Sequence, residues 1–136
     1  MKNFIDIEDI DSNQLKKIMA FSAGLKAERK NISKGTKDFK KYLANKVVAL
    51  LFKKPSTRTR FSFEVGIFQM GGVTITVSSN EMQLSNFESM ADTARVLSMY
   101  VDMIIIRTNN HFDIVDLINH SQIPIINGLS LSLIHI

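Results

Sequence analysis

Short apolar runs alternate along this chain with longer segments in which apolar residues recur at helical spacing. The runs have the length of buried strands and cover residues 47–52, 73–78, 103–106 and 123–126. No hairpin signal joins consecutive runs, and enough chain lies between them for the crossovers that parallel strands require. The pattern therefore predicts an α/β fold, a four-stranded parallel sheet flanked by helices.

The first helix is predicted to begin near Asp11. Asp11 and Gln14 have the spacing of an N-cap residue and its return partner. One face of this helix then carries Leu15, Ile18, Ser22 and Leu25. This periodicity is typical of an amphipathic helix, and residues 31–36 after it are interpreted as a loop.

Two further helices are predicted in the second half of the chain. Ser85 and Glu88 have capping-box spacing at the start of the first of them. That helix repeats Met90, Ala94, Leu97 and Val101. A shorter helix is predicted at about residues 110–119, with an inward face made of Ile114, Val115 and Ile118.

The segment at residues 61–70 has an ambiguous period. Its apolar residues alternate as in a strand, but they also fit two faces of a buried helix. A helix is preferred because Met70, Gly71 and Gly72 supply a C-terminal stop, and because a strand follows at a crossover's distance.

The first apolar run is followed by a segment whose polar groups suit an anion. Ser56, Thr57, Arg58, Thr59 and Arg60 place three hydroxyls and two guanidinium groups where a helix is predicted to start. For each residue alone, a helix cap or a solvated basic face is the commoner explanation. Together they suit an anion, since a helix N-terminus has free N–H groups and lies at the edge where open α/β sheets bind ligands.

Arg107 directly follows three isoleucines at the end of the third run. It could simply mark the point where a strand reaches water. Its strand would end, however, at the same edge of a parallel sheet as the first run. Arg107 and residues 56–59 could therefore close on one ligand.

Composition and charge narrow the classes of function. The chain has 136 residues, 45% of them hydrophobic and 22% charged, which is ordinary globular composition for one domain. The net charge of +4 comes from scattered basic residues without interleaved aromatics, so nucleic-acid binding is not expected. The absence of Cys, of a membrane-length apolar run and of a signal peptide predicts a cytoplasmic protein without membrane contact. His111, His120 and His135 lack metal-ligand spacing, so no metal is expected.

The string FKKPSTRTR at residues 52–60, followed by SFE at 62–64, resembles the carbamoyl phosphate signature of the aspartate and ornithine carbamoyltransferases. The similarity extends from about Lys2 to Ser130. It implies that residues 56–59 hold the phosphate and carbonyl of carbamoyl phosphate, while Arg60 serves the structure. It also implies that Arg107, in its Arg-Thr pattern, binds carbamoyl phosphate and polarises the carbonyl. The implied catalytic residues are Arg107, Arg58 and Thr59, with no metal or organic cofactor.

The loop around Gln83 distinguishes the two branches of that family. Taken alone, a polar loop of this kind is an exposed and mobile connection. In the resembled family, which forms homotrimers, this loop reaches the neighbouring subunit's site, and aspartate-specific members carry a Ser and a Lys there. This chain has no Lys after Lys54 and reads EMQL at residues 81–84, which resembles the ornithine type. Gln83 is then the substrate-binding residue that would be lent to the neighbour.

The implied reaction is carbamoyl transfer from carbamoyl phosphate to the δ-amine of ornithine, giving citrulline and phosphate in arginine metabolism. Residues 1–130 are expected to be an incomplete carbamoyl phosphate-binding domain and residues 131–136 a divergent, truncated tail, with the amino-acid-binding domain absent. His135 is not aligned with the family's His-Pro-x-Gln motif. The chain alone is therefore expected to be inactive. The alternatives are a non-catalytic phosphate-binding α/β module and a carbamoyltransferase for aspartate or another amine.

Overall fold

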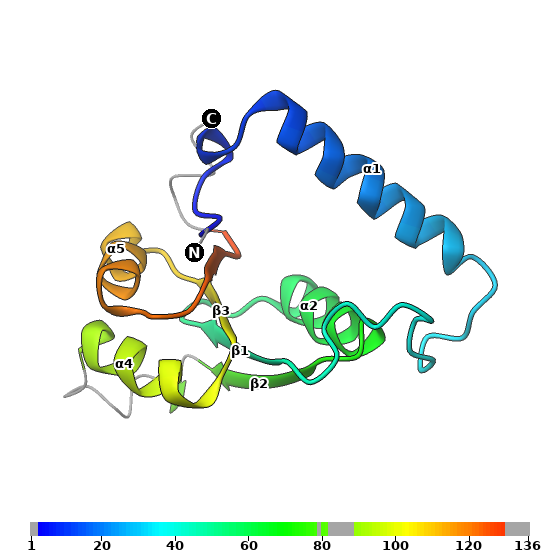
Figure 1. The fold of residues 1–136 in the computed structure, drawn as a ribbon. Coiled ribbons are helices and arrows are strands. Elements are labelled where there is room, and N and C mark those ends of the chain that lie inside the picture. The colour runs from blue at the N-terminus through cyan, green and yellow to red at the C-terminus, as the bar shows by residue number, and fades with distance from the viewer. Residues whose placement is uncertain (1–2, 79, 82–88, 130–136) are drawn as a thin grey trace.

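The computed structural model describes residues 3–78, 80–81 and 89–129, and within them four strands form one parallel sheet (Figure 1). The strands are β1 (Val47–Phe52), β2 (Val73–Ser78), β3 (Met103–Arg107) and β4 (Ile125–Asn127). Their order across the sheet is β2-β1-β3-β4, and every pairing is parallel. The predicted α/β fold with a four-stranded parallel sheet is confirmed.

Helices lie on both faces of this sheet. The described elements are the short 3-10 helix η1 (Ile7–Asp9) and the α-helices α1 (Ser12–Glu28), α2 (Thr57–Gln69), α4 (Met90–Tyr100) and α5 (His111–His120). Helix α2 covers one face, and α4 and α5 pack together on the other (Figure 1). Residues 61–69 thus belong to a helix, as the glycine stop indicated. None of the described helices is long and apolar enough to span a membrane.

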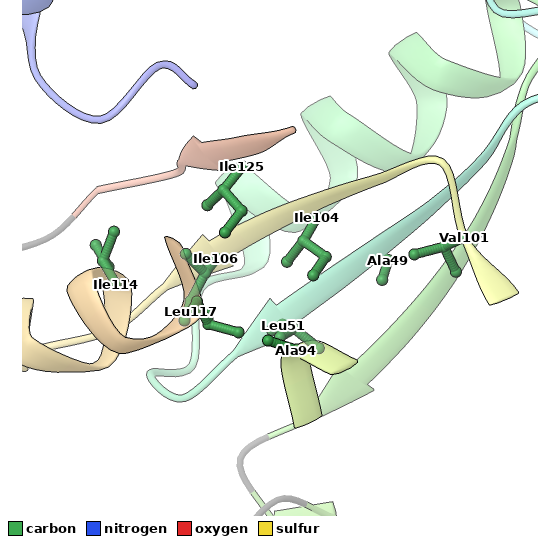
Figure 2. Close-up of a cluster of buried hydrophobic side chains, with 9 residues drawn as sticks. All are labelled: Ala49, Leu51, Ala94, Val101, Ile104, Ile106, Ile114, Leu117 and Ile125. Atoms are coloured by element: carbon green, nitrogen blue, oxygen red, sulfur yellow. The ribbon is translucent and has the colours of Figure 1, made fainter. Parts of the chain in front are cut away.

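The alternation of side chains along β1 and β3 divides the core in two. Ala49, Leu51, Ile104 and Ile106 point toward α4 and α5, and Figure 2 shows them with their helix partners. Val48, Leu50 and Ile105 point the other way, toward α2. Both central strands are therefore buried on both faces, which explains their uninterrupted apolar sequences. Each of the buried Val, Leu and Ile side chains contributes about 1.5–3 kcal/mol by leaving water.

The register of the sheet brings three strand ends level at one edge. Phe52 is paired with Ser78 of β2 and with Arg107 of β3. The pairing continues one residue further, because Lys53 N donates to Arg107 O at 2.9 Å. The loop that leads into α2 therefore starts beside Arg107, as the sequence predicted for parallel strands.

The turn after α2 depends on glycine. Met70 ends the helix and Gly71 follows with a φ of +88°, in the left-handed region that favours glycine. A Cβ on Gly71 would also lie 2.8 Å from Cβ of Lys41, which no real side chain tolerates. The chain can therefore reverse and enter β2 directly, and the predicted stop at the Gly pair is confirmed.

Helix α1 has the predicted cap but does not bury its apolar face. Asp11 Oδ1 accepts from Gln14 N at 2.7 Å, and Gln14 Oε1 accepts from Asp11 N at 3.2 Å. None of the helix's residues is buried, and Ile18, Met19 and Phe21 are about half exposed or more (47, 64 and 51%). Figure 1 accordingly shows α1 as the long blue helix that runs apart from the sheet.

A network of polar contacts joins the end of α1 to the end of α2. The guanidinium of Arg29 pairs with Asp38, whose side chain is only 9% exposed. Arg29 also donates to the carbonyls of Ser33 and Thr36, both at 3.1 Å. Asp38 N in turn donates to Gln69 O at 2.7 Å, at the last residue of α2. The loop at residues 29–38 is thus fixed by charge and hydrogen bonds rather than by apolar packing.

Three local predictions were wrong. Helix α4 is capped by Ser89, whose hydroxyl accepts from Asp92 N at 3.1 Å, so its start does not depend on Ser85, which lies outside the described residues. Val115 is 39% exposed, because α5 turns Ile114 and the next helical turn inward instead. Strand β4 begins at Ile125 rather than residue 123, since Pro124 has no N–H to donate.

The sequence interpretation also missed the N-terminal segment. Phe4 forms a parallel bridge with Ile126, its N–H donating to Ile125 O at 2.9 Å. Asn3 Oδ1 accepts from Ile125 N at 2.9 Å on the same side. The start of the described chain therefore covers the open edge of β4, which shields that strand from pairing with another molecule.

Candidate anion-binding site

The first turn of α2 presents free donors at the carboxyl edge of the sheet. Ser56 occupies the N-cap in an extended conformation, yet its side chain makes no capping hydrogen bond. The N-cap side chains of α1, α4 and α5 all cap their helices. The hydroxyl of Ser56 and the first N–H groups of α2 therefore remain available to a ligand. A simple helix cap, the plain alternative for Ser56, is not what the structure contains.

Arg107 reaches this helix start from β3. Its Nη1 donates to Thr59 Oγ1 at 3.1 Å and lies 3.4 Å from the carbonyl oxygen of Gly128. Its Nε is buried and has no hydrogen-bond partner within the described residues. A buried donor without an acceptor costs free energy until a ligand or water satisfies it. Arg107 is thus oriented toward α2 and is not a solvated strand end.

The remaining residues of the motif divide between solvent and helix. Thr57 and Arg58 are exposed on the first turn of α2, and neither side chain has a hydrogen-bond partner within the described part of the chain. Arg60 instead donates from Nε to Glu64 Oε1 at 2.9 Å, one turn along the same helix. The structural role of Arg60 stays a prediction, and Arg58 is the guanidinium of the motif without a side-chain partner in the described part of the chain.

A cavity of about 400 Å³ opens beside the same helix start. It lies on the β2 side, whereas Arg107 and Thr59 meet on the β3 side. Its lining combines hydroxyls and one guanidinium with aromatic rings: Phe52, Pro55, Ser56, Thr57, Arg60, Phe61, Thr76 and Ser78. The two hydroxyls of Ser56 and Thr57 are therefore open to solvent space from this side, next to the Arg107 contact.

Gln83 and His135, two residues discussed in the sequence analysis, lie outside the described residues. Among residues 3–78, 80–81 and 89–129, no group of three or more His, Asp or Glu is arranged to hold a metal ion. The described chemistry of the site is thus that of hydroxyls, guanidinium groups and backbone N–H donors.

Sequence reasoning missed three polar residues directly behind the site. Lys53 and Thr108 directly follow β1 and β3, and both contact one carboxylate oxygen of Asp113 on α5. Thr108 is only 3% exposed, and a hydroxyl buried to this degree normally has a hydrogen-bond partner. Its place immediately after Arg107 was the available signal, but its partner Asp113 could be identified only from the folded arrangement.

A pH effect is expected at Glu64, beside the cavity. Thr76 Oγ1 donates to Glu64 Oε1 at 2.6 Å, and this bond is the main reason that the pKa of Glu64 lies below its ordinary value of 4.5. Burial opposes that shift, and the contact with Arg60 adds to it. A lowered folded-state pKa contributes stability that is present above the unfolded pKa and is lost as pH falls through the folded one.

Replacing Thr76 by Val should therefore lower stability at neutral pH, and the difference from wild type should shrink as pH falls below 4.5 and Glu64 becomes protonated. Urea unfolding at about pH 7 and about pH 3 measures this difference. Thr74→Val is the matched control, because Thr74 lies two residues earlier on β2 and has no hydrogen bond to a carboxylate among the described residues. A T76V deficit that stays constant over this range would contradict the expectation.

The fold and the site together define an α/β domain with a cationic, uncapped helix N-terminus at the carboxyl edge of a parallel sheet. The chain belongs to the aspartate/ornithine carbamoyltransferase family: the model of that family's carbamoyl-P binding domain matches residues 2–135. This match confirms the resemblance that the motif at residues 52–64 indicated.

Curated relatives and solved structures agree with this assignment. The chain is 48% identical over 130 residues to an ornithine carbamoyltransferase of Cereibacter sphaeroides, covering 96% of this chain and 42% of the relative. A Paracoccus denitrificans ornithine carbamoyltransferase is 45% identical with the same coverage. The anabolic ornithine carbamoyltransferase of Campylobacter jejuni has a TM-score of 0.84 at 36% identity, covering 96% of this chain and 40% of that one. The chain therefore spans about two fifths of the length of these relatives.

Proposed function

We propose that this chain provides the carbamoyl phosphate half of the active site of an ornithine carbamoyltransferase. The observation that carries the proposal is the contact between Arg107 Nη1 and Thr59 Oγ1, which joins two segments distant in sequence at one helix N-terminus. Ornithine is proposed as the acceptor rather than aspartate, because the curated relatives at 43–48% identity are named for ornithine.

Each part of the site has a role in this proposal. The phosphate would lie at the start of α2, where Ser56, Thr57 and Arg58 supply donors and the helix end supplies partial positive charge. Arg107 and Thr59 would hold the carbonyl oxygen. The neutral δ-amine attacks the carbonyl carbon and negative charge builds on that oxygen. The bond to the phosphate oxygen then breaks, and the departing phosphate can take the proton that the amine loses. A guanidinium at the oxygen stabilises that charge, so orientation and electrostatics supply the catalysis.

The assembly and setting of the enzyme are part of the same proposal. We infer a homotrimer in which Gln83 of one subunit completes the site of its neighbour. We also infer a cytoplasmic role in arginine metabolism without metal or organic cofactor, with residues 1–130 forming the carbamoyl phosphate-binding domain. The length of the relatives supports a two-part site, because this chain matches only 42% of the Cereibacter sphaeroides protein.

A pair of phosphonates tests the proposal on the 136-residue chain. Phosphonoacetamide has a CH2 group in place of the bridging oxygen of carbamoyl phosphate, and methylphosphonate lacks the carbonyl end. Calorimetric titration should show phosphonoacetamide binding about tenfold more tightly, since a guanidinium–carbonyl hydrogen bond is worth about 1.5 kcal/mol or more. Arg58→Ala should weaken both ligands about tenfold, because its partner is the phosphonate.

The alternatives predict other results. A non-catalytic phosphate-binding module would bind the two phosphonates equally, because it has no use for the carbonyl. Equal affinity, or binding that is unaffected by Arg58→Ala, would therefore contradict the proposed function. The choice between ornithine and aspartate is tested in the complete enzyme by measuring which of the two amino acids it carbamoylates.

A further inference from the structure

A single carboxylate ties together the two loops that form the site. Asp113 Oδ2 accepts from Lys53 Nζ at 2.9 Å and from Thr108 Oγ1 at 2.8 Å. Lys53 follows β1 and lies three residues before Ser56, while Thr108 follows Arg107 at the end of β3. Asp113 therefore holds the entrance to the α2 loop and the exit of β3 from one point on α5.

The network is protected and built in depth. The side chain of Asp113 is 12% exposed, and Thr108 is 3% exposed. Thr108 Oγ1 also accepts from Asn110 N at 3.1 Å, and Asn110 Oδ1 caps α5 by accepting from Phe112 N at 3.0 Å. Such a partly buried, multiply bonded carboxylate differs from an exposed surface ion pair, which fixes little.

The hydrogen bonds to Asp113 restrict the distance between two groups of ligand donors: those at the start of α2 and the guanidinium of Arg107. Lys53 N is bonded to Arg107 O, so the backbones of the two loops already meet at one place. The bonds to Asp113 add a second place of attachment through side chains. Two attachments limit rotation of one loop against the other, whereas one attachment alone would permit it. The distance from the start of α2 to the Arg107 guanidinium is thereby restricted.

We propose that Asp113 is a positioning residue that sets the span between the phosphate donors on α2 and Arg107, and so selects ligands that carry a carbonyl at that distance from the phosphate. This inference rests on the proposed function. Asp113 touches neither donor group itself. It acts through Lys53 and Thr108, and a ligand that contacts α2 alone is insensitive to it.

The test compares two ligands on the same protein. In the Asp113→Ala chain, the preference for phosphonoacetamide over methylphosphonate should fall about tenfold, because a misplacement of about 1 Å is costly to a ligand held at both ends. The affinity for methylphosphonate should stay within about twofold, since its donors lie on α2 alone. General destabilisation would weaken both ligands by the same factor and leave the preference unchanged.

Two further variants test whether the Asp113 carboxylate acts through the side chains of Lys53 and Thr108. Lys53→Met removes one of the two bonds to Asp113, and Thr108→Val removes the other together with the bond that Thr108 Oγ1 accepts from Asn110 N. Both variants keep Asp113, and their combination should reproduce the loss seen with D113A. Asp116→Asn is the matched control, because it removes a charge from the same helix at a residue whose side chain is 43% exposed and contacts His120. A D116N chain that loses the preference as D113A does, or a K53M/T108V chain that keeps it, would overturn the proposal.

A ligand-free measurement makes the outcome independent of the proposed function. The side-chain ¹⁵N–H signal of Arg107 reports on its bond to Thr59, and Thr59→Val shows where the signal moves when that bond is lost. The signal should move in the same direction in D113A and stay in place in D116N. A signal identical in D113A and wild type overturns the positioning role, whereas a wild-type chain that binds neither phosphonate overturns the proposed function.

Discussion

Arg107→Met should weaken the binding of phosphonoacetamide about a hundredfold, because it removes charged donors that are each worth about 1.5–3 kcal/mol. The methionine keeps a similar volume, so the end of β3 should hold its place. Methylphosphonate should lose much less affinity than phosphonoacetamide, since the start of α2 remains intact. Calorimetric titration of both ligands against the variant measures the two losses.

Arg95→Met is the control for this experiment. Arg95 lies on α4, where its guanidinium pairs with Asp92 in an exposed (i, i+3) contact. The variant has the same change of composition and net charge as R107M, on a helix that packs on the sheet face opposite α2. Binding that falls equally in R95M and R107M would mean that overall charge, and not the placement of Arg107, attracts the ligand.

Asp38→Ala should lower the free energy of unfolding by about 3 kcal/mol, because it leaves the largely buried guanidinium of Arg29 without its countercharge. The loss should appear as a lower midpoint in urea with an unchanged slope. The Arg29→Met/Asp38→Leu pair should be less destabilised than the two single losses added together, since it leaves no unpaired charge.

Lys46→Met provides the comparison for that measurement. Lys46 pairs with Asp102 across 2.8 Å, but its side chain is 53% exposed. Removing an exposed pair of this kind should cost less than about 1 kcal/mol. A D38A chain as stable as K46M would show that the polar network at residues 29–38 contributes little to the stability of the fold.

The sheet was predictable because its signals are local. Each apolar run is bounded by charges or turn residues, and the glycine stop at Gly71 decided the ambiguous segment in favour of α2. The meeting of Arg107 with the start of α2 was also predictable, since parallel strands end at one edge. What the sequence did not predict depends on pairs distant along the chain. Asp113 lies 60 residues from Lys53, and only the register of β1 against β3 brings them together.

Helix caps and the burial of helix faces were also only partly predictable from the sequence. Ser85 and Ser89 both precede polar residues at cap spacing, and the pattern alone does not say which of them begins α4. Burial along α1 was not predictable either, because an amphipathic sequence says which face is apolar and not whether another element covers it. The role of Gln83 stays a prediction, since that loop lies outside the described residues.

Helix α1 and the site depend on different interactions. The helix buries none of its residues, and it contacts the following segments through the Arg29–Asp38 network and an edge-to-face contact of Phe21 with Tyr42. The start of α2 rests instead on the buried strands β1 and β3. Amide protons of α1 should therefore exchange through local openings that cost little free energy, while those of β1 and β3 behind the site require opening of the sheet. The strands that carry the anion site can thus stay folded while α1 unwinds and re-forms.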